Sequence, residues 1–427
     1  MRSTDPCSAP PVQVPLLPMH RESAIALWRQ RLRWLSAPGI SGRAMERLEY
    51  RLRLHLHVLS RVPDAAEEAP AQGEAAFVRL AAALLATDRE RRARAAGQAL
   101  TWLAEAPRRD AARWALALCP GGEVMDAMRG GYARQPGLRA LLVEIWRIQG
   151  AAIPRELLDP AEPHAGGPEL QAALLRYQAD RPETGIGAFR PWYHGSGRAP
   201  GGSPSATAAI VEALRGGLLR RDPEAPVALR RAIEAAAEAE ARSPLLRLAA
   251  LSGDAAFHPV LQAHARAEPA TGFPLLALWG RREAVADLLP GLESPRDNPH
   301  AARAWARLTG HELPRRPRIR LAEGGEGRGT AGGAIADPEA AVNWWQAHRG
   351  RWPAKERRAG GRRLDVPAVR ARLEAEAGLD SADALDLVGV ITGRPVGVAA
   401  GTWHRLRRRA LAAAAVAMAA GEQAARA

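Results

Sequence analysis

The chain contains very little lysine and few cysteine or aromatic residues. Lys355 is its only lysine, so its basic charge comes from 59 arginines, set against 46 aspartates and glutamates. Two cysteines, Cys7 and Cys119, are too few for a disulfide framework or a cysteine-based metal site. Aromatic residues make up only 5% of the chain. The low number of cysteines fits a reducing compartment.

Long hydrophobic runs are also missing. Prolines interrupt residues 1–20 before an apolar signal segment can form, and we expect residues 1–19 to be disordered. The C-terminal run LAAAAVAMAA is too short and too rich in alanine to span a bilayer. The sequence therefore predicts a cytoplasmic protein without membrane association.

Apolar residues recur at helical spacing, which predicts an all-α protein. Five glycines each follow an apolar helical segment, and they are Gly121, Gly150, Gly253, Gly280 and Gly310. Within two clusters they recur at intervals of roughly 30 residues, a period typical of stacked helical repeats, and a second apolar stripe begins after most of them. Helix pairs this short cannot bury their apolar faces alone, so we predict that successive pairs stack into an α-solenoid.

Changes in composition divide the predicted α-solenoid protein into parts. After the disordered start, the predicted parts are an N-terminal helical cap at 20–90, a solenoid at 91–319, a Gly-rich linker at 320–338 and a basic, tryptophan-containing helical module at 339–427. A loop rich in Gly, Pro and Ser at 189–208 either splits the solenoid or extends from one of its turns.

Two features resemble known bacterial repeat proteins. The first is a pair of helical segments containing His20, Glu22, Ala24, Leu27 and Trp28, then Leu48, Glu49, Arg51, Leu52, His55 and Leu56. This pair resembles the opening of a family of bacterial HEAT-repeat proteins of uncharacterised function. The second is the glycine-ended helix pairs, which resemble the short HEAT-like repeats of phycobilin lyases. The resemblance implies an interaction scaffold, and the repeat type alone implies a chromophore lyase as a weaker candidate.

The sequence predicts no catalytic, cofactor-binding or metal-binding set of residues. His55 and His57 are two positions apart, so they point about 200° apart on a helix and cannot face one ion. Asp380 and Asp383 precede an apolar helical segment, where carboxylates accept from free backbone N–H groups. We therefore interpret Asp380 or Ser381 as the helix cap and Asp383 as a favourable charge in the first turn, rather than the two aspartates as an acid/base pair. This favours a non-enzymatic protein without a cofactor.

Positive charge is concentrated in one quarter of the chain. Residues 303–409 contain 21 Arg and Lys against 12 Asp and Glu, although a GC-rich genome would also favour arginine. Guanidinium groups pair with carboxylates or phosphates, and tryptophan stacks on bases or on arginine. The candidate binding residues are Trp344, Trp345, Arg349, Arg351, Trp352, Arg357, Arg358, Arg362 and Arg363.

The stretch VNWWQAHRGRWP, residues 342–353, has three interpretations. It closes a hydrophobic core, docks a protein, or binds nucleic acid. A helix with Asp337 as N-cap and Pro338 in its first turn places Trp344 and Trp345 on one stripe with small residues. This geometry favours core closure, then protein docking, then nucleic acid.

We predict a non-enzymatic protein–protein interaction scaffold with an unidentified protein partner on the concave helix face. The alternative is binding of a nucleic-acid phosphate backbone by the Arg-rich C-terminal quarter, with base-excision chemistry of the kind that some HEAT-like glycosylases perform.

Overall fold

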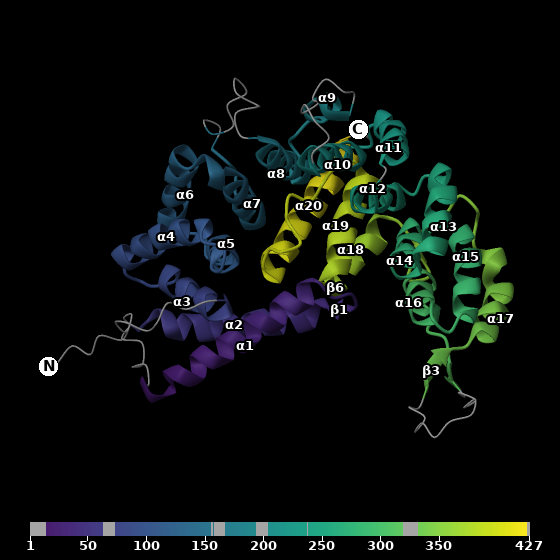
Figure 1. Ribbon diagram of the computed structural model, residues 1–427, viewed down its shortest axis with the longest axis horizontal. Helices are drawn as coiled ribbons and strands as arrows, with labels where there is room; N and C mark the ends of the chain where they lie inside the picture. Colours follow the sequence, from purple (N-terminus) through teal and green to yellow (C-terminus); the bar gives the residue numbers. More distant parts are fainter. Residues whose placement is uncertain are drawn as a thin grey trace. The chain divides into compact units, whose positions relative to one another are not determined.

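Helices make up most of the chain in the computed structural model, which describes residues 14–62, 73–154, 157, 167–193, 204–236, 238–318 and 332–424. The predicted all-α class is confirmed, since the strands found in these ranges are two to five residues long (Figure 1). No helix among the described residues is long and apolar enough to cross a bilayer.

The α-helices before residue 240 are α1 (Leu17–Leu35), α2 (Gly42–Ser60), α3 (Gly73–Leu84), α4 (Arg89–Ala104), α5 (Arg109–Leu118), α6 (Gly122–Arg134), α7 (Arg139–Gln149), α8 (Gly167–Asp180), α9 (Arg190–Tyr193), α10 (Pro204–Leu219), α11 (Glu224–Ala235) and α12 (Ala239–Ser252). The later ones are α13 (His258–Ala267), α14 (Pro269–Trp279), α15 (Arg282–Glu293), α16 (Asn298–Thr309), α17 (Pro338–His348), α18 (Val366–Ala375), α19 (Leu379–Thr392) and α20 (His404–Ala424). Short 3-10 turns are η1 (Val14–Leu16), η2 (Pro136–Leu138), η4 (Ile186–Ala188), η5 (Ala255–Phe257) and η6 (Arg349–Arg351).

In the part of the chain that the structure describes, three antiparallel strand pairs join segments of the chain. They are β1 (Ile40–Ser41) with β6 (Glu376–Ala377), β2 (Arg315–Arg318) with β3 (Gly332–Ala336), and β4 (Arg358–Ala359) with β5 (Arg362–Arg363). The first pair bonds the turn after α1 to a segment in the last fifth of the chain.

Contacts divide the chain into two units. Unit 1 contains residues 1–184, 372–385 and 396–427, and unit 2 contains residues 185–371 and 386–395. The predicted module at 339–427 is therefore divided between them. The reason is long-range bonding, because the β1–β6 pair and the contacts of residues 402–404 bind C-terminal residues to the first helices.

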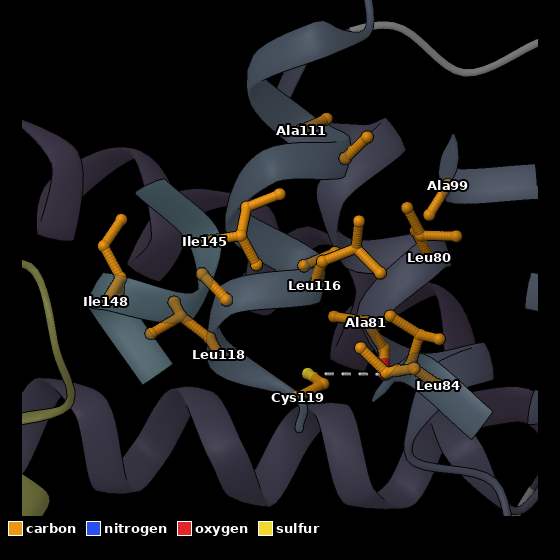
Figure 2. Close-up of a cluster of buried hydrophobic side chains, with 14 of the residues drawn as sticks. Leu80, Ala81, Leu84, Ala99, Ala111, Leu116, Leu118, Cys119, Ile145 and Ile148 are labelled. Atoms are coloured by element: carbon orange, nitrogen blue, oxygen red, sulfur yellow. Dashed lines mark hydrogen bonds between the residues drawn. The ribbon is translucent and has the colours of Figure 1, made fainter. Parts of the chain in front are cut away.

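Unit 1 has a core of leucine, alanine and large aromatic side chains. Trp28 of α1 stacks on Phe77 of α3, with ring centroids 3.6 Å apart, and both side chains are buried. Figure 2 shows residues of α3, α5 and α7, among them Leu80, Leu116 and Ile145, pointing toward one another. Alternate helices pack together in this core: α3 contacts α5, and α5 contacts α7.

Unit 2 repeats this pattern of contacts. Helix α12 contacts α14, and α14 contacts α16, while each is also bound to its neighbour in sequence. Buried Trp279 of α14 and Trp305 of α16 are among the largest side chains of this core. Helix α17 packs on α15 at the end of the series (Figure 1).

Four of the five predicted turn glycines do end helices. Gly150, Gly253, Gly280 and Gly310 are the C-caps of α7, α12, α14 and α16, all in the left-handed conformation. At Gly121 the prediction is wrong, because α5 already ends at Leu118 and Gly121 instead precedes α6. Pro120 accounts for the difference, since proline ends a helix at or before the residue preceding it.

The predicted irregular segments contain regular structure at their ends. Residues 14–19 belong to η1 and α1, whereas residues 1–13 lie outside the described ranges. The loop predicted at 189–208 contains α9 and the start of α10. Its residues 194–203 lie outside the described ranges. The linker predicted at 320–338 ends in β3 and the first residue of α17, and its residues 320–331 are likewise outside.

Candidate interaction site in residues 337–363

The candidate site begins with helix α17, whose start is where the sequence predicted it. Asp337 is the N-cap, its carboxylate accepts a hydrogen bond from Glu339 N at 3.0 Å, and Pro338 occupies the first turn. This prediction of the helix start is confirmed. Trp344 and Trp345 follow in the second half of the helix.

Trp344 is half-buried among aromatic side chains of unit 2. The ring of Trp305, from α16, meets it edge-on with centroids 5.5 Å apart. The imidazoles of His311 and His348 lie nearly parallel to it at 5.4 Å and 4.2 Å. His348 Nδ1 also donates to Trp344 O at 2.7 Å, which holds the second imidazole in place. Trp344 therefore packs α17 against the end of α16.

The other two indoles pack against each other. Trp345 and Trp352 meet edge-to-face with centroids 5.5 Å apart, and Trp352 is only 4% exposed. The guanidinium of Arg358 lies 5.1 Å from the centroid of the Trp352 ring. A nucleic-acid base can stack on Trp352 only if this packing is broken.

Arg358 connects the turn after α17 to the following hairpin. Its guanidinium pairs with Glu356 at 2.7 Å and donates to Arg351 O at 2.8 Å and Gly361 O at 3.2 Å. One side chain thus bonds both the turn and the hairpin. The Arg358 guanidinium is therefore engaged in contacts within unit 2.

The hairpin itself is a two-residue connection between β4 and β5. Gly360 and Gly361 form its turn with φ of +58° and +73°, which is the combination that a type I′ turn requires. Arg362 and Arg363 form β5 and are exposed. The GG pair therefore fixes where these two arginines lie.

Arg357 binds the C-terminal ends of two helices. Its guanidinium donates to Ala250 O and Leu251 O in the last turn of α12, at 3.2 Å and 2.9 Å. It also donates to Leu278 O and Trp279 O at the end of α14, at 3.1 Å and 3.0 Å. The last carbonyls of a helix have no partner within it, so one cation satisfies four of them.

The same segment continues across the next helix end. Arg358 N donates to Gly280 O at 2.6 Å, and Gly360 N and Gly361 N donate to Arg307 O and Leu308 O of α16 at 2.8 Å and 3.0 Å. Residues 357–361, which we call the strap, therefore cross the C-terminal ends of α12, α14 and α16 in sequence order.

The strap explains why three of the turn positions are glycine. A Cβ at Gly253 would lie 2.3 Å from Arg357 Nε, one at Gly280 would lie 2.7 Å from Arg358 O, and one at Gly310 would lie 2.4 Å from Gly360 O. These glycines provide a left-handed turn and a close approach at once. The sequence indicated the turns but contained no signal for the strap.

Burial, with Arg281 nearby, lowers the pKa of Arg357 to about 9. The side chain is therefore still protonated at neutral pH, and its four carbonyl contacts favour the charged form. Arg357 is a helix-end cap rather than a free group for phosphate.

The nine predicted residues lie in one segment of unit 2, but they divide into two groups. Trp344, Trp345, Trp352, Arg357 and Arg358 pack or hydrogen-bond within the unit. The exposed cations are Arg349, Arg351, Arg362 and Arg363, together with Lys355. Within the ranges described, their side chains make no hydrogen bond or ion pair. We call these five residues the basic edge.

Residues of the N-terminal motif also come together, in unit 1. His20 Nδ1 lies 2.9 Å from His55 Nδ1, between α1 and α2. Glu49 is buried and pairs with Arg31 at 2.9 Å. Arg31, which the sequence did not single out, is fully buried, and its guanidinium lies 4.9 to 5.6 Å from the rings of Trp28, Trp114 and Trp403. This cluster joins distant helices through a charge that is paired and surrounded by aromatic rings.

Asp380 differs from its predicted role as a helix cap. Its Oδ2 accepts a hydrogen bond from Gly39 N at 2.6 Å, in the turn that follows α1. Asp383 is buried on the same helix. The partner of Asp380 lies near the other end of the chain, so local spacing could not identify it. No group of three His, Cys, Asp or Glu side chains suited to a metal ion occurs among the residues described.

Comparison of the chain with protein-family models, with curated proteins and with solved structures found no match.

Proposed function

We propose that the chain is a non-enzymatic protein–protein interaction scaffold built on an α-solenoid of short HEAT-like helix pairs. The proposal is supported by the contacts between alternate helices, α3 with α5 and α7, and α12 with α14 and α16. It is supported as well by the left-handed glycines Gly253, Gly280 and Gly310, which end helices at nearly equal intervals along the chain. The resemblance of the N-terminal segment to bacterial HEAT-repeat proteins agrees with it.

The basic edge is the proposed partner surface, and one observation carries this choice. Five cations are exposed close together in the sequence, and the ranges described hold no anionic partner for any of them. The hairpin holds the backbone of Arg362 and Arg363, so little additional backbone entropy is lost there when a partner binds. An acidic protein surface provides the missing carboxylates, and arginine pairs with carboxylates bidentately.

The tryptophans favour a protein partner over a nucleic acid. Proteins that grip single strands stack bases on exposed aromatic rings. Here Trp352 is buried, and Trp344 is packed among Trp305, His311 and His348. The aromatic rings that nucleic-acid binding would need already pack against other side chains of unit 2.

The experiment compares three forms of the full-length chain as bait for proteins from lysate, quantified by mass spectrometry with and without nuclease. The test variant is Arg362→Glu/Arg363→Glu. The matched control is Arg231→Glu/Arg296→Glu, which makes the same charge change at exposed arginines of unit 2. We expect a set of acidic proteins that the control retains and the test variant loses at least tenfold, regardless of nuclease.

Equal capture by the test variant and the wild type would refute the basic edge as the partner surface. Capture that nuclease abolishes would instead support phosphate-backbone binding. A labelled oligonucleotide titrated at several salt concentrations would then show an affinity that falls steeply with salt.

A further inference from the structure

A pocket in unit 1 lies between helices α3 and α4, in a region that the basic edge does not include. Its volume is about 300 Å³. The residues that line it are Arg79, Leu80 and Ala83 of α3 and Arg91, Arg94, Ala95 and Gln98 of α4. All seven belong to the same unit.

Helical spacing brings the polar lining residues together. Arg91, Arg94 and Gln98 follow one another at intervals of three and four positions, so they share one face of α4. Arg79 and Ala83 are likewise four positions apart on α3. Counted over the described residues, the lining therefore contains three guanidinium groups and one carboxamide, and no acidic side chain.

Of the three arginines, Arg91 is held at the pocket by a hydrogen bond to the backbone. Arg91 donates to Ser60 O at the end of α2 at 2.9 Å, which fixes the direction of its side chain. Arg94 lies 3.6 Å from Glu90 in a pair whose side chains are 69% and 85% exposed, and pairs of this kind are weak. For Arg79 we find no ion pair among the described parts of the chain.

The floor of the pocket is apolar. Leu80, Ala83 and Ala95 line the pocket and belong to the buried core of unit 1, so they provide its apolar lining. A site of this kind fits a ligand with an anionic group for the guanidinium side and an apolar part for the floor.

We propose that this pocket binds a small anion carrying at least two negative charges, as a phosphate ester or a polycarboxylate does. Guanidinium groups recognise both kinds of oxyanion by bidentate hydrogen bonds. A cleft lined by charge of one sign also raises the local concentration of the opposite ion. The binding is independent of the scaffold function, because none of its residues belongs to the basic edge.

The test uses the full-length chain in low-salt buffer at pH 8 and isothermal titration calorimetry with two probes, inorganic phosphate and citrate. The variant Arg79→Gln/Arg94→Gln removes two cations and leaves Arg91 bonded to Ser60 O. The control variant Arg33→Gln/Arg129→Gln removes two exposed cations of unit 1 that do not line the pocket. We expect the first variant to bind at least tenfold more weakly than the wild type, and the control to stay within twofold.

Tighter binding of phosphate than of citrate would identify a phosphate ester as the natural class, and the reverse order a polycarboxylate. The proposal is overturned if the wild type binds neither probe at millimolar concentration. It is overturned as well if both variants lose affinity equally, since net charge alone then explains the effect. Thermal unfolding of each variant shows whether a loss of binding reflects a loss of folding.

Discussion

At the scale of single residues, glycine at a helix end can meet two separate requirements: a left-handed backbone, and room for another segment to approach closely. Gly150 and Gly280 have nearly the same left-handed backbone, with φ of +70° and +74°. No described residue lies within 4 Å of a Cβ built on Gly150, whereas one on Gly280 would meet Arg358 O at 2.7 Å. The two positions therefore separate the cost of backbone conformation from the cost of a blocked contact.

Substituting alanine at these two positions measures both costs. We expect Gly150→Ala to lower the free energy of unfolding by about 1 to 2 kcal/mol, the cost of a left-handed residue with a Cβ. Gly280→Ala should cost about 1 to 2 kcal/mol more, because the bond from Arg358 N to Gly280 O is also disturbed. Urea denaturation measures both values. Equal losses would show that the strap tolerates a methyl group there.

At the scale of elements, each unit uses a C-terminal segment to close the ends of stacked helices. In unit 2 this is the strap across α12, α14 and α16. In unit 1, Thr402 Oγ1 donates to Ile148 O of α7 at 2.6 Å, and Trp403 Nε1 donates to Leu118 O of α5 at 2.8 Å. Both segments provide donors where helices have carbonyls without partners.

A buried carboxylate connects α9 to the turn before α11. Asp222 accepts hydrogen bonds from Arg190 at 2.9 Å and 3.0 Å, from the Tyr193 hydroxyl and from Glu224 N. Burial opposes ionisation, but these donors outweigh it and lower the pKa of Asp222 to about 2. The tyrosine hydroxyl that donates to it has a raised pKa, first because of burial and then because of this carboxylate.

This contact predicts a specific dependence of stability on pH. A depressed carboxyl pKa stabilises the fold above the pKa of the unfolded chain, near 4, and that stability disappears as pH falls to about 2. Between pH 5 and pH 2 we expect the wild type to lose about 2 kcal/mol more than Asp222→Asn. Denaturant titrations at several pH values, with Asp110→Asn as an exposed control, measure the difference. Parallel curves for the wild type and Asp222→Asn would contradict the assignment.

At the scale of the whole molecule, the last segment of the chain completes unit 1. His404 N donates to Glu49, and Gly401 O accepts from Arg31, so residues 401–404 meet the buried charges of α1 and α2. Burial, together with the neighbouring Arg407, lowers the pKa of His404 to about 4, so the ring is neutral near pH 7. The first and last parts of the chain therefore form one folding unit.

Removing the last segment should loosen unit 1 in particular. In a chain that ends after Pro395, the amides of α5 and α7 should exchange with deuterium at least tenfold faster, because the contacts of residues 401–404 are lost. A chain that lacks only residues 415–427 keeps these contacts and is the control. Hydrogen exchange followed by mass spectrometry compares the two. Unchanged exchange in α5 and α7 would contradict the prediction.

The sequence by itself determined what depends on local physics. Helical spacing predicted the all-α class, Asp337 and Pro338 predicted the start of α17, and four turn glycines predicted helix ends. Each of these depends on bonds between near neighbours in the chain, so composition and spacing suffice. The solenoid, the protein partner on its concave helix face and the resemblance to HEAT-repeat proteins stay predictions.

Only the tertiary structure decided what each arginine does. Arg357 and Arg362 look alike in sequence, yet one satisfies carbonyls of α12 and α14 while the other is exposed in β5. The sequence predicted a helix-capping role for Asp380, but its carboxylate accepts a hydrogen bond from Gly39 N. In both cases the partner belongs to a distant part of the chain, and no local pattern encodes such a pairing. The division of residues 339–427 between two units has the same cause.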